Sequence, residues 1–137
     1  MYEDGYIDND KAQYFLQKSL EKGNKVAIAL QGQYYLNNSD FEKALYYFNK
    51  SIEAGEVIDG YYGLLMMHSY FPEYKNRSSD KAFEYLNRIL DYNSKNESDE
   101  NSKYKIASEF YMDDKKYYDL EKAEYYKKKA EKYSVYN

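Results

Sequence analysis

The chain has 137 residues, of which 32% are charged and 43% belong to the hydrophobic class, and its net charge is −4. This size and balance indicate one folded domain with a core, and they exclude a disordered chain. The absence of cysteine excludes disulfides and thiolate metal sites, and the acidic balance disfavours nucleic acid and anionic membranes as partners.

Targeting segments are not visible in the sequence. The acidic stretch at residues 1–9 lacks the apolar core of a signal peptide, and no apolar run has the length of a membrane span. We therefore expect a cytoplasmic protein.

Helix start and stop signals divide the chain into an acidic lead-in (1–9) and a single helical domain (10–137). Gly23 and Gly55 are expected as left-handed stops of the helices that end there, and Asn93 takes the same position at the end of another helix. Pro72 should end the helix that precedes it. Residues 94–102 read as a polar loop. In chain order, we expect helices near 10–23, 25–38, 40–55, 57–71, 80–93, 101–113 and 119–134.

The turn before the expected helix at 40–55 carries capping signals. Ser39 and Asp40 are both good N-caps, and Ser39 with Glu42 has the spacing of a capping box. The helix that follows, residues 40–55, has the clearest pattern in the chain, because its alanine, aromatic and isoleucine side chains recur at helical spacing.

One pattern recurs four times along the chain. Lys-Ala pairs place an alanine at intervals of 32, 38 and 41 residues, each followed by large side chains three or four residues later. This spacing is typical of helix-hairpin arrays, in which each unit packs against its neighbours. The four alanines are Ala12, Ala44, Ala82 and Ala123.

The intervening helices repeat as well, and a small residue recurs inside each of them. We expect Gly32, Gly63 and Ser108 to face the alanine of the helix that follows, because a small residue at one helical position allows close approach. The aligned triplets are Ala27–Gly32–Tyr35, Ile58–Gly63–Met66 and Lys103–Ser108–Tyr111.

Residues 27–55 resemble the Sel-one-like repeat, a relative of the tetratricopeptide repeat. The matching residues are Ala27, Gly32, Tyr35, Asp40, Lys43, Ala44, Tyr47, Phe48, Lys50 and Gly55. The resemblance covers most of residues 10–134, although the family's Gly-rich turn is replaced by residues 37–39 and the first unit has only its second helix. It implies an all-α fold, a right-handed α-solenoid of antiparallel helix hairpins, and a role as an adaptor in signalling, assembly or bacterial virulence.

The concave surface of such a solenoid is the expected binding surface. At about 100° per residue, one stripe of the first helices faces away from the packing side. Leu64 and Met67 are the best anchor candidates, because methionine-rich surfaces adapt to partners, although core packing is the commoner role of such side chains, and Met66 is expected in the core. The candidate partner-binding residues are Gln33, Asn37, Tyr61, Leu64, Met67, His68, Lys105 and Glu109.

Catalytic and metal chemistry find little support. His68 is the only histidine, which excludes a His-based triad or a two-His zinc site and favours a surface or capping role. The acidic stretch at 97–100 lacks the spacing of a calcium loop. The lysines of residues 115–129 lie beside tyrosines that could stack on bases, but interleaved glutamates and the need for a polar end helix explain them more simply.

The sequence thus favours a non-enzymatic protein-interaction module without cofactor or metal. Its acidic charge favours a basic protein or peptide as partner, bound by a monomer or weak homodimer, and an immunity-type protein is a second version of this reading. The alternative is a permanent accessory subunit of a larger assembly, whose tyrosines would make a large interface.

Overall fold

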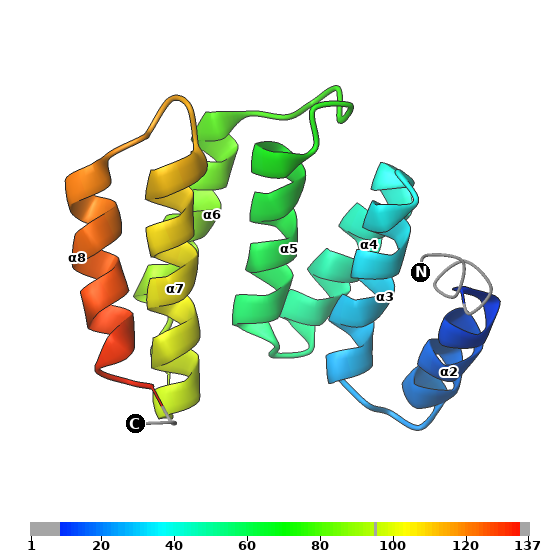
Figure 1. The fold of residues 1–137 in the computed structure, drawn as a ribbon. Helices are drawn as coiled ribbons and strands as arrows, with labels where there is room; N and C mark the ends of the chain where they lie inside the picture. The colour runs from blue at the N-terminus through cyan, green and yellow to red at the C-terminus, as the bar shows by residue number, and fades with distance from the viewer. Residues whose placement is uncertain (1–8, 95, 135–137) are drawn as a thin grey trace. The chain divides into compact units, whose positions relative to one another are not determined.

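The computed structural model describes residues 9–94 and 96–134, and these residues form seven α-helices and no strand (Figure 1). The all-α prediction is confirmed. Asn9, expected in the lead-in, already belongs to the first helix, and the rest of the lead-in lies outside the described residues. The helices are α2 (Asn9–Glu21), α3 (Val26–Asn37), α4 (Phe41–Glu53), α5 (Val57–Tyr70), α6 (Ser79–Asp91), α7 (Glu97–Asp113) and α8 (Leu120–Glu131).

Two compact units make up the chain, Met1–Gly60 (unit 1) and Tyr61–Asn137 (unit 2). In unit 1, α3 packs against both α2 and α4; in unit 2, α7 packs against both α6 and α8. Short turns join α3 to α4 and α7 to α8, so each of these two pairs is an antiparallel helix hairpin. The boundary between the units falls within α5.

Three helices begin with the same side-chain cap. The side chains of Asp40, Ser78 and Asp119 each accept a hydrogen bond from the backbone N–H of the lysine three residues later, at 3.1–3.2 Å. Such a bond satisfies one of the backbone donors that a helix start leaves without a partner. The capped lysines, Lys43, Lys81 and Lys122, immediately precede the repeated alanines, so the cap fixes where each repeated helix begins.

Ser39 ends α3 instead of capping α4, so the predicted Ser39–Glu42 capping box is wrong. Its backbone is left-handed, with φ 60°, and the N–H of Asp40 donates to the carbonyl of Tyr35 at 2.9 Å. The predicted stops Gly23 (φ 81°) and Gly55 (φ 97°) take the same conformation after α2 and α4. A serine therefore occupies a position at which glycine avoids the steric cost of a left-handed backbone.

Helix α7 begins at Glu97, four residues before the predicted start at residue 101. Asn96 caps it by accepting a hydrogen bond from the N–H of Asp99 at 2.7 Å, and acidic side chains in the first turn complement the helix dipole. The polar residues of this stretch, which were expected to form a loop, therefore stabilise the start of a helix.

Asn93 does not form the predicted left-handed stop, because Tyr92 already leaves α6 in an extended conformation. The buried Lys103 instead satisfies the end of the helix: its ammonium donates to the carbonyl of Tyr92 at 2.8 Å and to the carboxylate of Glu100 at 2.9 Å. Hydrogen bonds from Ser94, then Lys103, and then Tyr104 lower the pKa of Glu100, and this carboxylate neutralises the buried ammonium. The lysine thus occupies a core position as part of a satisfied polar network.

The repeated alanines form part of the core in three of the four copies. Ala44, Ala82 and Ala123 are at most 1% exposed, whereas Ala12 is exposed. Ser108 approaches its alanine as predicted, since its hydroxyl donates to the carbonyl of Ala123 at 2.8 Å. The repeated pattern therefore reports real packing positions, and its first copy is the exception.

Gly32 faces Phe48, four residues after the alanine that it was predicted to meet. A Cβ atom on Gly32 would lie 2.7 Å from the Phe48 ring, and Phe48 is only 1% exposed. A glycine is required here because the buried ring occupies the space of a side chain. Gly63 is also buried.

A second arrangement recurs in the α3–α4 and α7–α8 hairpins. In each hairpin, a tyrosine of the first helix stacks on a tyrosine of the second, with ring centroids 5.6 and 5.9 Å apart, and a lysine ammonium lies 5.2 Å from the centroid of the first ring. The groups are Lys43, Tyr35 and Tyr47 in unit 1, and Lys122, Tyr111 and Tyr126 in unit 2. The lysine that receives the N-cap thus also holds the aromatic pair.

A membrane-spanning element was sought among the helices of the described residues, and none is both long and apolar enough to serve.

Candidate interaction surfaces

The two predicted site residues of unit 1 lie next to each other on α3. Gln33 is half-buried and Asn37 is exposed, and the side-chain amide of Gln33 donates to the side-chain oxygen of Asn37 at 3.0 Å. These amides are accessible to a partner, but part of their hydrogen-bonding capacity is used between themselves.

Leu64 and Met67 are buried, which contradicts their candidacy as anchors and agrees with core packing, the commoner role of such side chains. Their exposures are 2% and 1%, whereas Met66, which was expected in the core, is half-buried. The sequence of α5 is apolar on nearly every side, so helical periodicity could not separate its packing face from a free face. Neither side chain can contact a partner without a change in the fold.

His68 is a structural residue and not a surface one. It is 8% exposed, and its Nδ1 accepts a hydrogen bond from the backbone N–H of Ser78 at 3.0 Å. Its ring lies against those of Tyr74 and Tyr85, with centroids 5.2 and 5.8 Å away. Burial, and then the positive charge of Lys81, lowers the pKa of His68, so the neutral ring accepts this bond at neutral pH.

Tyr61, the remaining predicted residue of α5, is half-buried in contacts within unit 2. Its ring stacks on Tyr85 at 5.8 Å, and the guanidinium of Arg88 lies 5.9 Å from the ring centroid and donates to its hydroxyl at 3.4 Å. A partner could therefore contact only the exposed edge of the Tyr61 ring.

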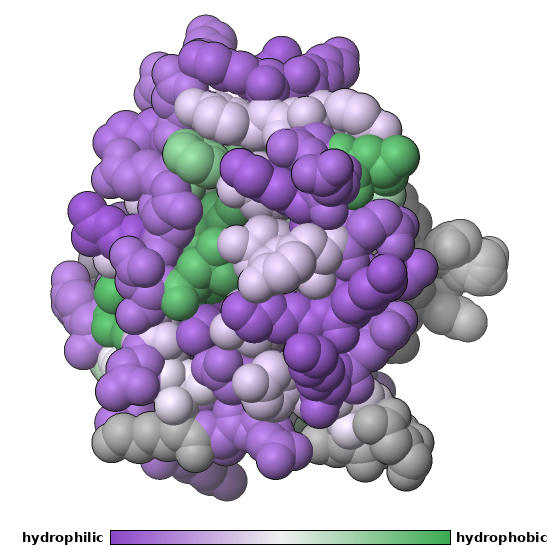
Figure 2. All heavy atoms as spheres, turned by 90° about the vertical axis from the view of Figure 1, so that its left-hand side faces the viewer, coloured by the Kyte–Doolittle hydropathy of each residue, from purple (hydrophilic) through white to green (hydrophobic). Residues whose placement is uncertain are grey.

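Lys105 and Glu109 are exposed on α7 and line a shallow groove of about 370 Å³ between α7 and α8. The α8 side of this groove carries another pair of opposite charges, Lys127 and Glu131, and Ala130 lies between them. The side of the molecule on which α8 lies is mostly hydrophilic, and its hydrophobic patches are small and separated (Figure 2). This surface therefore suits weak polar contacts more than a buried anchor.

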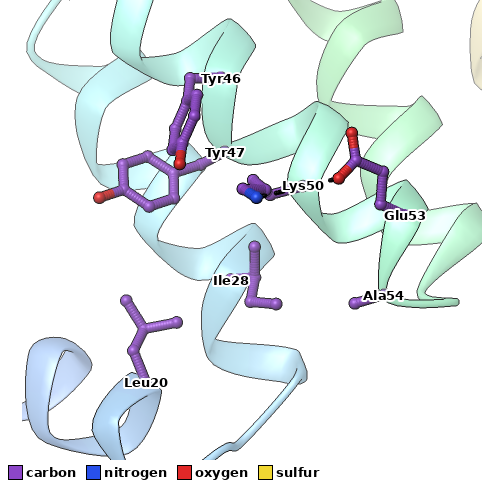
Figure 3. A pocket seen from close by; sticks show the side chains of 7 residues that line it. All are labelled: Leu20, Ile28, Tyr46, Tyr47, Lys50, Glu53 and Ala54. Carbon is purple, nitrogen blue, oxygen red and sulfur yellow. Dashed lines mark ion pairs between the residues drawn. The ribbon is translucent and has the colours of Figure 1, made fainter.

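A larger groove, of about 440 Å³, lies in unit 1, and none of the predicted site residues lines it (Figure 3). Leu20 from the end of α2, Ile28 from α3 and Ala54 after α4 supply its apolar surface. Tyr46 and Tyr47 stand on one side with their rings edge to face at 5.1 Å, and the Lys50–Glu53 ion pair, with 3.9 Å between the charged atoms, lies beside them.

The sequence held one signal for this groove. Tyr46 falls outside the periodic core face of α4, and its side chain is 56% exposed. The ammonium group of Lys50 lies 5.7 Å from the centroid of the Tyr46 ring. An aromatic residue that lies off the core face of a repeated helix could have been proposed as a contact residue. The apolar surface of the groove could not have been predicted from the sequence, because its side chains come from three different helices.

The described part of the chain contains no group of three or more His, Cys, Asp or Glu side chains placed to hold a metal ion. Asp114, in the turn between α7 and α8, is buried and accepts hydrogen bonds from the N–H groups of Lys116 and Tyr117 and from the hydroxyls of Ser69 and Ser79. Its carboxylate therefore organises the turn between α7 and α8.

Comparisons with family models, with curated proteins and with solved structures gave no match.

Proposed function

We propose that the chain is a non-enzymatic protein-interaction module of the Sel-one-like-repeat type, with its hairpins stacked as an α-solenoid. The observation that carries this proposal is the groove of unit 1, in which an apolar floor, two tyrosines and an ion pair meet at the surface. A peptide or helix edge with one apolar anchor fits such a site, because burial of the anchor supplies affinity and the polar rim supplies orientation.

Tyrosine is well suited to this role. Tyr46 is 56% exposed, and a partner that covers its ring gains apolar contact while the hydroxyl stays at the wet edge. Tyrosine also loses little conformational freedom when it is covered, since it has only two side-chain torsions. Together with Leu20 and Ile28, the ring gives the groove the composition of an interface centre.

The expected partner is a protein or peptide bound by a monomer or weak homodimer, in the cytoplasm. The net charge of −4 attracts a basic partner over a distance of about one Debye length and increases the rate of encounter more than the final affinity. An adaptor and an immunity-type protein both agree with this description.

A permanent accessory subunit is the second candidate, and the exposed apolar side chains favour it. Phe15 is 61% exposed, Tyr125 is 56% exposed and Leu30 is 50% exposed. In an obligate assembly such side chains would be covered by neighbouring subunits. High solubility of the purified monomer would count against this candidate.

The proposal is tested by affinity capture from lysate followed by reconstitution with the purified partner. The wild type is compared with the groove variant Tyr46→Glu and with the matched variant Leu120→Glu, which alters an exposed apolar residue of α8. We expect Tyr46→Glu to weaken the reconstituted complex by at least about tenfold, which corresponds to roughly 1.4 kcal/mol. Leu120→Glu should bind as the wild type does.

Equal binding by all three proteins would remove the groove from the proposed function. Loss in both variants would indicate the broad interface of a permanent subunit. Circular dichroism and an unchanged unfolding midpoint should accompany each variant, so that a folding defect is not mistaken for a binding defect.

A further inference from the structure

Helix α2 exposes a face that its counterparts in the other repeat copies bury. Ala12 is exposed, whereas the equivalent alanines of α4, α6 and α8 are at most 1% exposed. Phe15, three residues later, is 61% exposed, but the equivalent Tyr47 is half-buried. Together with Leu16 and Ser19, these residues form one stripe at helical spacing, the open face of α2.

The two complete hairpins indicate what kind of element covers such a face. Ala44 is buried in the hairpin of α3 and α4, and Ala123 in that of α7 and α8. The covering helix presents a small residue in both hairpins: Gly32 lies against the Phe48 ring, and Ser108 donates to the carbonyl of Ala123. Among the described residues, α2 packs against α3, and no other described helix covers its open face.

Charge on α2 indicates the character of a partner for this face. Lys11, Lys18 and Lys22 are exposed, and at about 100° per residue they fall within about 40° of one another, along one edge of the open face. The opposite edge faces α3, because the amide of Gln13 donates to the hydroxyl of Tyr35 at 3.5 Å and Leu20 lines the groove with Ile28. Only the lysine edge is free to meet a partner.

The same charges disfavour a second copy of this chain as the occupant. Two α2 helices packed antiparallel about a twofold axis would bring one lysine edge against the other, and like charges at an interface reduce affinity. An incoming helix with acidic side chains along that edge would instead be attracted, although Glu21 already lies 3.7 Å from Lys18.

We infer that the open face of α2 binds an amphipathic, acidic helix of another protein, which sets apolar side chains against Ala12, Phe15 and Leu16. This inference rests on the proposed function, and it names a second contact face and the chemistry of its partner. The affinity comes from the covered Phe15 ring, and the lysine edge sets the direction and the salt dependence.

The chain itself supplies a probe of this chemistry. Residues 97–113, the sequence of α7, form a covering helix in their own hairpin and carry five acidic residues and two lysines, a net charge of −3. A fluorescein-labelled peptide of this sequence is titrated with the full chain, and binding is followed by fluorescence anisotropy. The variants are Phe15→Asp, the double variant Lys11→Glu/Lys18→Glu, and the matched control Tyr125→Asp, whose exposure of 56% is close to that of Phe15.

We expect saturable binding that weakens at least about tenfold in Phe15→Asp and several-fold in the lysine variant, and that falls as salt is added, whereas Tyr125→Asp binds as the wild type. Absence of saturable binding, or equal loss in Phe15→Asp and Tyr125→Asp, would overturn the inference. A wild-type dimer in light scattering that Phe15→Asp abolishes would also overturn it, by assigning the face to a second copy. Tighter peptide binding after removal of residues 1–8 would assign the face to the chain's own N-terminal segment, against the inference.

Failure of this inference can be distinguished from failure of the proposed function. A captured partner that is lost with Tyr46→Glu but kept with Phe15→Asp supports the interaction module and removes α2 from it. Loss with Phe15→Asp alone assigns the contact to the open face of α2.

Discussion

At the scale of single residues, the burial of the Gln31 amide is not explained by its surroundings. It lies on α3, is 1% exposed, and neither its amide nitrogen nor its oxygen has a hydrogen-bond partner. A buried polar group without a partner costs about 1–3 kcal/mol relative to one in water. The buried Gln31 amide therefore lowers the folding stability of unit 1.

Replacing Gln31 with methionine should stabilise the protein. Met has the same unbranched length, so it fills the space without a polar amide, and the expected gain in the free energy of unfolding is about 1–3 kcal/mol. The midpoint of urea unfolding measures this gain. Gln33→Met is the control, because Gln33 is half-buried and already bonded to Asn37, and its change should stay within about 0.5 kcal/mol. A lower midpoint for Gln31→Met would show that the amide has a partner in solution.

At the scale of elements, the segment between α5 and α6 depends on His68. This side chain accepts the N–H of Ser78, and the hydroxyl of Ser78 in turn accepts the N–H of Lys81 at the start of α6. One neutral imidazole thus joins the end of one helix to the cap of the next. Protonation would remove the acceptor and add a positive charge near Lys81.

The stability of the protein should therefore fall when the pH drops below about 6.5. The pKa of His68 is lowered in the folded protein from its ordinary value of 6.5, so the unfolded chain takes up the proton first as the pH falls. The free energy of unfolding then decreases with falling pH until the pH passes the folded pKa, and it does not depend on this group above about 6.5.

Urea unfolding between pH 5 and 7.5 measures this effect, with His68→Gln as the control. Glutamine keeps a side-chain oxygen as acceptor but does not titrate, so the slope between about pH 5 and 6.5 should be present in the wild type and absent in the variant. The same slope in both proteins would assign the pH dependence to other groups.

At the scale of the whole molecule, the sequence predicted the helices better than the site. Caps, stops and the repeated alanines are local signals, and six of the seven helices start and end within a few residues of expectation. The start of α7 was missed because Asn96 and the acidic residues after it fit a loop as well as a helix start. Leu64 and Met67 were misassigned because α5 is apolar on most sides, and the unit 1 groove was missed because three helices contribute to it.

The recurrence of one lysine–tyrosine–tyrosine arrangement in both units provides a test of the repeat itself. Lys43 and Lys122 lie at the same distance from the first ring of their hairpins, and both follow a capping aspartate by three residues. If the two hairpins are copies of one structural unit, the two lysines should contribute equally to stability, even though no side-chain partner is common to both.

We expect Lys43→Ala and Lys122→Ala each to lower the free energy of unfolding by about 0.5–1 kcal/mol, the usual range of an exposed cation–π contact. Because the two lysines share no partner, the double variant should equal the sum of the single variants within about 0.5 kcal/mol. Lys127→Ala, an exposed lysine of α8 with no ring contact among the described residues, controls for the loss of one charge. Unequal losses in Lys43→Ala and Lys122→Ala, measured by urea unfolding, would show that the shared geometry does not carry a shared energy. A loss in Lys127→Ala as large as in either variant would show that the removed charge alone accounts for the change.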